Sequence, residues 1–149
     1  MANSIQYAKI ASTPSEKVKT NELYGRVRSA FAEYEASAEQ STVTMFVIPN
    51  GARIVRSRLG HDALGSSTTL SVGYAAHTKS DGTAQAADVD EYLAATASTG
   101  AVGHDVANTI ALGENSVVDA DKDGVPVTVT LAGANGTGTI QLSMFYVID

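Results

Sequence analysis

The sequence contains no cysteine and no tryptophan, and only three of its 149 residues are proline. The absence of cysteine excludes disulfides, thiol catalysis and zinc–thiolate sites, and a cytosolic origin is the simplest expectation. No apolar run approaches the ~20 residues that a membrane-spanning helix needs. The first ten residues lack a basic region followed by an apolar core, so we predict neither a secretory signal nor a membrane partner.

What the sequence does contain suits short strands and turns. Its apolar fraction of 44% is largely alanine and valine, and threonine, serine and glycine are abundant beside them. A chain of 149 residues fits a single domain. A domain of this size can bury about 70% of its unfolded surface in one core.

Charge is distributed unevenly along the chain, whose formal net charge is −6. Residues 1–58 hold eight basic and five acidic residues, a net of +3, whereas residues 59–149 hold two and eleven, a net of −9. This polarity favours contact between the basic part of one subunit and the acidic part of another, or of a shell, although strand faces can also differ in charge by chance. Because the acidic majority would repel phosphates, nucleic acid is not an expected partner.

Residues 42–74 give the strongest structural signal, with the sequence TVTMFVIPNGARIVRSRLGHDALGSSTTLSVGY. Apolar and β-branched residues predict three strands, over residues 41–48, 52–59 and 68–75. Pro49-Asn50-Gly51 predicts a tight turn between the first two, since proline fixes φ and Asn-Gly accepts positive φ. The first two strands are therefore predicted to pair as a hairpin.

The second of these strands contains three arginines. Strict alternation places Arg56 and Arg58 on one face of the strand, and that face must look outward. Together with Arg53, they form the clearest predicted interaction surface of the chain. A guanidinium can form charge-assisted, bidentate hydrogen bonds with carboxylates on such a partner.

Residues 1–23 are polar, and we predict an extended N-terminal arm with a short edge strand over residues 5–10. Ile5, Tyr7 and Ile10 are the side chains that such an arm would bury against a neighbouring subunit or a shell. The alternative is a frayed terminus. Residues 24–37 fit either a helix or a strand, and a strand is preferred because the segments that follow are strands and would pair with it.

The second half of the chain resumes the strand pattern after one predicted helix. Asp88 and Glu91 form a capping box, which predicts that a short helix begins there. Strands are predicted over residues 106–112, 125–131 and 139–148, and a turn at residues 133–138 joins the last two. The predicted fold class is therefore all-β with one short helix: an antiparallel β-sandwich or jelly roll formed by residues 24–149, preceded by the arm.

The motif DADKDG matches the first half of an EF-hand calcium loop. Asp119, Asp121 and Asp123 stand at alternate positions from which carboxylates can converge on one cation. The acid that closes such a loop is replaced by Thr130, and the flanking segments are predicted strands, so an ordinary β-turn is the preferred interpretation. Calorimetric titration with Ca²⁺ and melting in the presence of a chelator test the metal site.

Gly-His-Asp occurs twice, at residues 60–62 and 103–105. Adjacent residues of an extended chain project in opposite directions, so neither aspartate is placed to orient its own histidine for catalysis. We predict that both tripeptides are turns. With no Gly-x-Ser-x-Gly elbow and no phosphate-binding loop, the sequence carries no catalytic motif, and no enzymatic activity is expected.

The run IPNGARIVRSRLGHDALGSSTTLSVGY, followed by ADVDEYLAATAS and closing with VPVTVTLAGANGTGTIQLSMFYVID, resembles small structural proteins of tailed bacteriophages. It is most similar to head decoration, or cement, proteins and related virion proteins built as β-sandwiches or jelly rolls. The resemblance covers about residues 40–149 and rests on a pattern of strands and turns.

The resemblance implies a non-enzymatic protein, made in the host cytoplasm, that binds the outer surface of the assembled virion head and clamps neighbouring capsomers. Its implied partners are the major capsid protein and further copies of itself, often in a homotrimer. The resemblance assigns no binding or catalytic role to any residue of this chain. The roles of the arginines and of the arm are inferred from the residues themselves. The alternative is a tail, fibre or head-surface receptor-binding module, in which DADKDG would form a calcium-dependent carbohydrate site.

Overall fold

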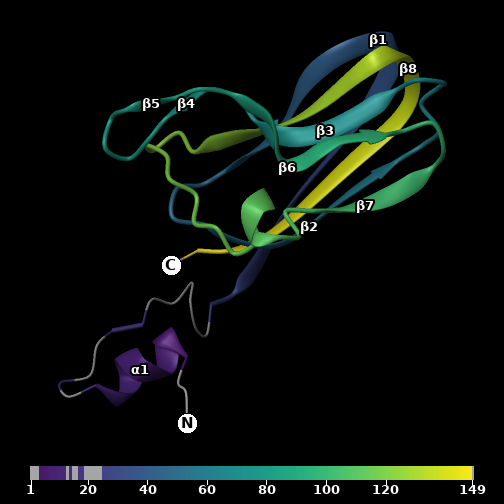
Figure 1. Ribbon diagram of the computed structural model, residues 1–149. Helices are drawn as coiled ribbons and strands as arrows, with labels where there is room; N and C mark the ends of the chain where they lie inside the picture. The colour runs from purple at the N-terminus through teal and green to yellow at the C-terminus, as the bar shows by residue number, and fades with distance from the viewer. Residues whose placement is uncertain (1–3, 13, 15–16, 19–24, 149) are drawn as a thin grey trace.

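The computed structural model describes residues 4–12, 14, 17–18 and 25–148 (Figure 1). Nearly all of its regular structure is antiparallel β-sheet. The elements are α1 (Ile5–Ala11), β1 (Val27–Ile48), β2 (Arg53–His61), β3 (Thr69–Tyr74), β4 (His77–Thr78), β5 (Ala84–Gln85), β6 (Asp88–Ala97), β7 (Val102–Val106), the 3₁₀ helix η1 (Ile110–Leu112) and β8 (Val125–Val147). The predicted all-β class with antiparallel sheets is confirmed. Among the described residues, no helix is long and apolar enough to span a membrane.

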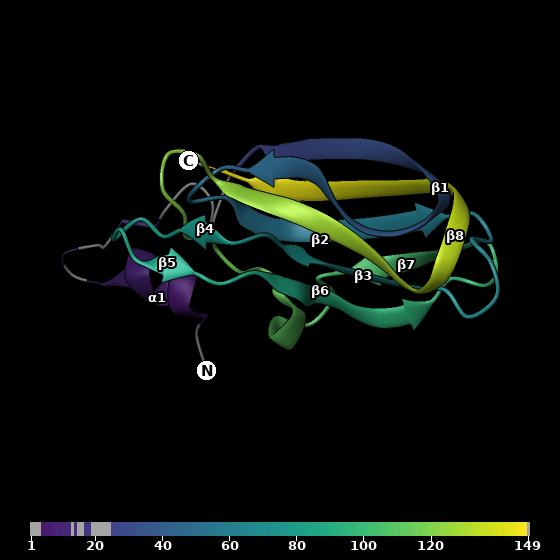
Figure 2. The ribbon, with the colours of Figure 1, turned by 90° about the horizontal axis from the view of Figure 1, so that it is seen from above.

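One six-stranded sheet forms the body of the molecule, in the order β6-β3-β8-β2-β7, with β1 along β8. The two long strands β1 and β8 pair over their whole lengths and belong to both halves of the sheet. The first part of β8 pairs with β3, and its last part pairs with β2. The sheet folds at the middle of this ribbon, so that β3 and β6 lie in one layer and β2 and β7 in the other (Figures 1 and 2).

The fold of the ribbon depends on a few residues with left-handed backbone. Register shifts flank Glu39 on β1, next to Ala38 with φ of 58°. On β8, Gly133 and Gly138 have φ of 83° and 129°, values that cost glycine little. The predicted turn at residues 133–138 is therefore wrong. Its glycines bend one continuous strand from one layer into the other, so the chain does not reverse there.

The core lies between the two layers and is made by alternate residues of their strands. Its largest fully buried side chains are Ile48, Ile54, Leu59, Leu64, Leu70, Val72, Val106, Val127, Val129, Ile140, Leu142 and Met144. Each such side chain contributes about 1.5–3 kcal/mol through its removal from water. This apolar packing holds the layers together in a chain that has no disulfide.

The predicted hairpin of residues 41–48 and 52–59 is wrong in its pairing. The turn at Pro49–Gly51 exists: Ala52 N donates to Pro49 O at 3.3 Å, and Gly51 has φ of 77°. However, the strands on either side of it pair with opposite ends of β8 and lie in different layers. The turn therefore carries the chain across the sandwich and does not close a hairpin.

The helix predicted at Asp88 is also wrong, because residues 88–97 form strand β6 beside β3. Local propensity favoured a helix, but pairing with β3 buries Tyr92 and half-buries Leu93 against the core. The strand predicted over residues 106–112 is wrong over most of its length. β7 ends at Val106, and η1 follows. The strand predicted over residues 24–37 is confirmed from Val27 onward, and Tyr24 lies outside the described residues.

The N-terminal segment forms a helix, so the edge strand predicted over residues 5–10 is wrong. Ser4 caps this helix, α1, by accepting a hydrogen bond from the Tyr7 backbone N–H at 3.2 Å. No residue of α1 is buried, and Ile5, Tyr7 and Ile10 are 71%, 58% and 49% exposed. The other positions of the predicted arm, residues 1–3, 13, 15–16 and 19–23, lie outside the described part of the chain.

Candidate interaction surface

Exposed arginine and phenylalanine side chains meet on the outer face of the layer that contains β2. Arg56 of β2 pairs in register with Phe145 of β8, and Arg58 pairs with Ser143. On the other side of β8, Ser143 pairs with Phe31 of β1. Directly opposite residues on one face of an antiparallel sheet have Cβ atoms about 4.5–5.5 Å apart. We call this surface, made by Phe31, Arg56, Arg58 and Phe145, the Arg–Phe face.

A β-bulge in β2 sets which side chains reach this face. The register shifts between Ile54 and Arg56, so that the extra residue, Val55, is exposed. Ile54 is fully buried on one side of the shift, and Ser57 is fully buried on the other. The strict alternation assumed from the sequence is therefore broken. Arg56 and Arg58 are nevertheless both exposed, and their role in binding stays a prediction.

Two phenylalanines on this face were not identified from the sequence. Phe31 is 61% exposed and Phe145 is 38% exposed, which is unusual for large aromatic side chains. Val27 of β1, 60% exposed, extends the apolar area at the start of that strand. Aromatic residues and arginine are enriched at the centres of protein–protein interfaces, where they carry much of the binding energy. The composition of the Arg–Phe face is therefore that of an interface.

The arginines of this face are only weakly engaged within the chain. Arg56 Nη2 lies 3.8 Å from Asp105 Oδ1, and both side chains are more than half exposed. Such a surface ion pair contributes little to stability. The guanidinium of Arg58 lies over Gly103 of β7, where an added Cβ would come within 2.6 Å of Nη2. Within the described residues Arg58 makes no ion pair, so its charge is available to a partner.

Arg53 was predicted as part of the same surface, and the register places it opposite Val147, on the sheet face that also carries Phe145. Unlike Arg56 and Arg58, it is held by contacts within the chain. Its Nη1 donates to the backbone carbonyl of Asn115 at 2.5 Å, and an isolated β-bridge joins Arg53 to Val117. Arg53 therefore ties the start of β2 to the loop before β8. Ile5, Tyr7 and Ile10 all lie on α1, which Figure 1 shows below the sandwich and far from β4 and β5.

The opposite end of the same outer face is acidic. Glu33 accepts from Gln141 Nε2 at 2.7 Å, and Glu35 accepts from Thr139 Oγ1 at 2.8 Å. These cross-strand bonds hold the two carboxylates on the surface of β1. One face of the sheet therefore runs from basic and aromatic at one end to acidic at the other.

The DADKDG segment forms a compact turn before β8. Asp121 Oδ1 accepts from Asp123 N at 2.8 Å, and Gly124, with φ of 76°, donates its backbone N–H to Asp121 O at 3.2 Å. Asp119 Oδ1 accepts from Ser80 N and Oγ, which lowers the pKa of Asp119. Across the described residues no group of three or more His, Asp or Glu side chains is arranged to hold a metal ion. A calcium site at Asp119, Asp121 and Asp123 stays a prediction.

The two Gly-His-Asp tripeptides are not turns around their histidines, so that prediction is wrong. His61 ends β2 and His104 lies within β7, and the neighbouring glycines, Gly60 and Gly103, are paired in register. The two Nε2 atoms are 3.1 Å apart, with ring planes within 15° and centroids 5.2 Å apart. The centroid separation exceeds the N–N distance by about two ring radii, so the imidazoles meet tip to tip.

This contact defines the protonation of the pair. His61 Nδ1 lies 2.7 Å from the backbone carbonyl of Asp62, which can only accept, so Nδ1 carries the proton. His61 Nε2 then accepts from the N–H of His104 Nε2. A proton added to His61 Nε2 would break this bond between β2 and its edge partner β7. Burial, and then the charge of His61, lower the pKa of His104.

We expect this pair to make the protein less stable in mild acid. The pKa of His104 is lower in the folded state than in the unfolded state, so the folded protein favours the neutral imidazole. The stability gained from the neutral histidine pair is therefore complete above the unfolded pKa of about 6.5. That stability is lost as the pH falls through the pKa of His104 in the folded protein. Thermal melting from pH 7.5 down to pH 5 should show a decrease in melting temperature that is smaller in His104→Gln. His77→Gln, at the third histidine, is the control and should keep the wild-type slope. An unchanged slope in His104→Gln would contradict the assignment.

Comparison with known proteins adds to this picture at the level of fold. No protein-family model and no curated protein sequence matches the chain. A chain from the capsid asymmetric unit of cyanophage Pam1 superposes with a TM-score of 0.63 at 15% identity, covering 93% of this chain and 96% of that one. A chain from the capsid of Ralstonia phage GP4 gives a TM-score of 0.63 at 22% identity, covering 84% and 86%.

A third similar chain comes from the acidic stable capsid structure of Helicobacter pylori bacteriophage KHP30. Its TM-score is 0.51 at 16% identity, with 83% of this chain and 92% of that chain covered. All three matches span most of both chains, so the likeness concerns the whole sandwich and not a single motif. The protein thus has a β-sandwich fold that also occurs in chains of phage capsid structures.

Proposed function

We propose that this protein is a non-enzymatic structural protein of a phage virion that decorates the outside of the head, acting as a cement between capsomers. The observation that carries the proposal is the Arg–Phe face, where two exposed arginines and two exposed phenylalanines lie together on one sheet face. Three phage capsid structures contain chains of the same fold, which supports a place in the virion.

The major capsid protein is the proposed partner of the Arg–Phe face. Its binding surface would present carboxylates to Arg56 and Arg58 and an apolar area to Phe31 and Phe145. Charge-assisted hydrogen bonds to the guanidiniums would fix the orientation of the protein on the capsid, and burial of the phenylalanine rings would provide most of the affinity. Several such contacts on one shell would add up through multivalency, so that each one need only be modest.

Self-association into a homotrimer is the second part of the proposal. Two features of β1 favour contact between copies. Its outer face carries Glu33 and Glu35, which can pair with basic residues of another copy that lie outside the Arg–Phe face. Among the described residues it pairs with β8 alone, so one edge of a 22-residue strand is free to pair with another chain. A head-to-tail contact of this kind closes into a ring when its rotation permits.

Cosedimentation tests the binding. Purified protein is mixed with undecorated, expanded heads of the matching phage, and the pellet is expected to hold it at a saturating, stoichiometric level. Protein that stays in the supernatant at stoichiometric excess would rule the proposal out. Light scattering of the free protein measures the oligomer. A monomer both in solution and on the reconstructed head would contradict the trimer while leaving the binding intact.

A further inference from the structure

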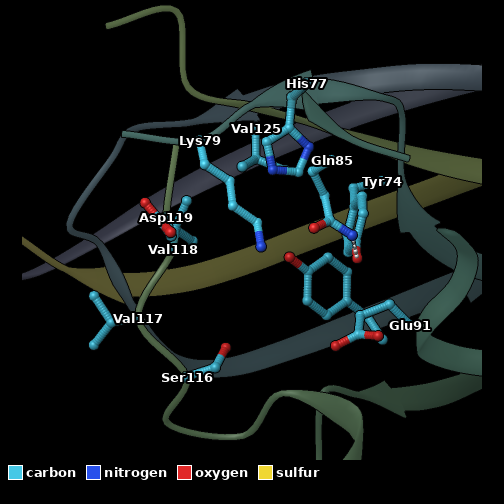
Figure 3. A pocket seen from close by; sticks show the side chains of 11 residues that line it. Tyr74, His77, Lys79, Gln85, Glu91, Ser116, Val117, Val118, Asp119 and Val125 are labelled. Carbon is cyan, nitrogen blue, oxygen red and sulfur yellow. Dashed lines mark hydrogen bonds between the residues drawn. The ribbon is translucent and has the colours of Figure 1, made fainter. Parts of the chain in front are cut away.

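A small pocket lies at one end of the sandwich and shares no lining residue with the Arg–Phe face. It is formed where β3 leads into the β4–β5 hairpin, where β6 begins, and where residues 116–119 approach β8 (Figure 3). Its volume is about 180 Å³. Pockets for drug-sized ligands occupy about 300 Å³ or more, so this one suits a single small ring. Neither the proposed head contact nor the histidine pair uses it.

One side of the pocket is a fixed aromatic wall. Tyr74 meets His77 edge to face, with ring centroids 5.2 Å apart, and meets Tyr92 in the same manner at 6.0 Å. Gln85 Nε2 donates to Tyr74 Oη at 3.2 Å, which holds that ring in place. Tyr92 is 6% exposed, and its burial raises its pKa, so its hydroxyl stays protonated. The wall is therefore preorganised, and the half-buried Tyr74 exposes more of its ring than the buried Tyr92 does.

The other sides carry charges of both signs. The side chain of Lys79 extends into the pocket, with Asp119 beside it and Glu91 across from it (Figure 3). Lys79 makes no ion pair within the described part of the chain. Burial raises the pKa of Glu91, and the nearby Asp88 and Asp90 raise it further. Donors and acceptors thus face one another across the opening.

This arrangement selects against simple ions. The ammonium of Lys79 repels a cationic side chain, although the aromatic wall alone would suit one. Glu91 and Asp119 repel a phosphate or carboxylate, although Lys79 alone would attract one. A neutral ring that carries hydroxyl groups meets neither penalty. Each hydroxyl can donate to a carboxylate and accept from an ammonium, while the C–H face of the ring packs on tyrosine.

We propose that this pocket binds one neutral sugar ring, such as the terminal hexose of a glycan. The ring would pack against Tyr74, and its hydroxyls would bridge Lys79 and Glu91. A virion protein with such a pocket would hold carbohydrate weakly at each copy and strongly through many copies. This site shares no residue with the Arg–Phe face, so sugar binding and head binding can be tested independently of each other.

The test is a ¹H–¹⁵N chemical-shift titration of the full chain with glucose, galactose, mannose and N-acetylglucosamine, each up to about 50 mM. At least one sugar is expected to give saturable shifts at the amides of Lys79, Glu91 and Tyr92, with a dissociation constant of about 1 mM. Lys79→Ala and Glu91→Gln should each weaken binding about tenfold, the effect of one lost hydrogen bond to a charged group. Lys122→Ala, at an exposed cation outside the pocket, is the matched control and should bind as wild type.

Inorganic phosphate and arginine serve as the charged comparison ligands. Saturable shifts with either of them, in the absence of shifts with sugars, would overturn the proposal in favour of an ion site. No saturable shift with any of the four sugars would overturn it outright. Cosedimentation of Lys79→Ala with heads separates the two functions, because that variant is expected to decorate heads normally whatever the sugar result.

Discussion

Reversing both charges of the Arg–Phe face is expected to abolish decoration of the head. The double variant Arg56→Glu/Arg58→Glu replaces two attractive contacts to carboxylates by two repulsive ones. Truncation of a buried, hydrogen-bonded charge at an interface costs about 2–5 kcal/mol, so the pair should weaken binding by at least about a hundredfold. Both side chains are exposed, and the substitutions should leave the fold intact. Cosedimentation with undecorated heads measures the loss.

A matched pair of single variants separates the surface from the charge. Arg58→Glu and Lys122→Glu make the same change in net charge, but Lys122 lies in an exposed turn and pairs with its neighbour Asp123 at 2.7 Å. Only Arg58→Glu is expected to weaken binding. Wild-type binding should also fall as salt is added, since exposed charges are screened. A folded double variant that decorates heads normally would refute the Arg–Phe face.

The second large effect concerns Gly73 in the middle of the sheet. A Cβ at this position would lie 2.0 Å from Asp88 O and 2.6 Å from Val89 C, both backbone atoms of β6. Backbone in a paired strand cannot move aside as a flexible side chain can, so Gly73→Ala must push β6 away from β3. We expect a loss of about 3 kcal/mol or more in the free energy of unfolding, at the upper end for overpacking. In thermal melting this corresponds to a decrease of about 6–12 °C.

Gly60→Ala is the control for this substitution. Gly60 is also a strand glycine, but an added Cβ there meets no atom within 4 Å. Its stability is expected to stay within about 0.5 kcal/mol of wild type, the usual range for a surface substitution. Equal melting temperatures for Gly73→Ala and wild type would show that β6 does not lie against β3 as described.

Local patterns predicted strands well where burial alternates. The alternation of Val125, Val127, Val129 and Leu131 predicted the first part of β8, and it holds because one side of that strand faces the core throughout. The fold class followed from several such segments. The helix predicted at Asp88 failed because an acidic, alanine-rich segment has helical propensity of its own. Pairing with β3 outweighs that propensity, and the sequence of β6 does not record its partner.

The pairing of the strands could not be predicted from the local sequence. β1 and β2 are joined by a real turn, yet each pairs with β8 at the other end of the chain, and nothing in residues 42–59 indicates that. Two of the four residues of the Arg–Phe face depend on this pairing, because Phe31 and Phe145 are far apart in sequence. The tip-to-tip contact of His61 and His104 depends on the register of β2 and β7 in the same way. The repeated Gly-His-Asp was the available signal, and it was interpreted as two turns.

The position of the protein in an averaged reconstruction of the intact phage particle tests the central claim most directly. We predict density for the sandwich on the outer surface of the head, at the junctions between capsomers, with Arg56, Arg58, Phe31 and Phe145 against the major capsid protein. Density at the tail or fibre, inside the shell, or on the head with that face turned to solvent would contradict the account.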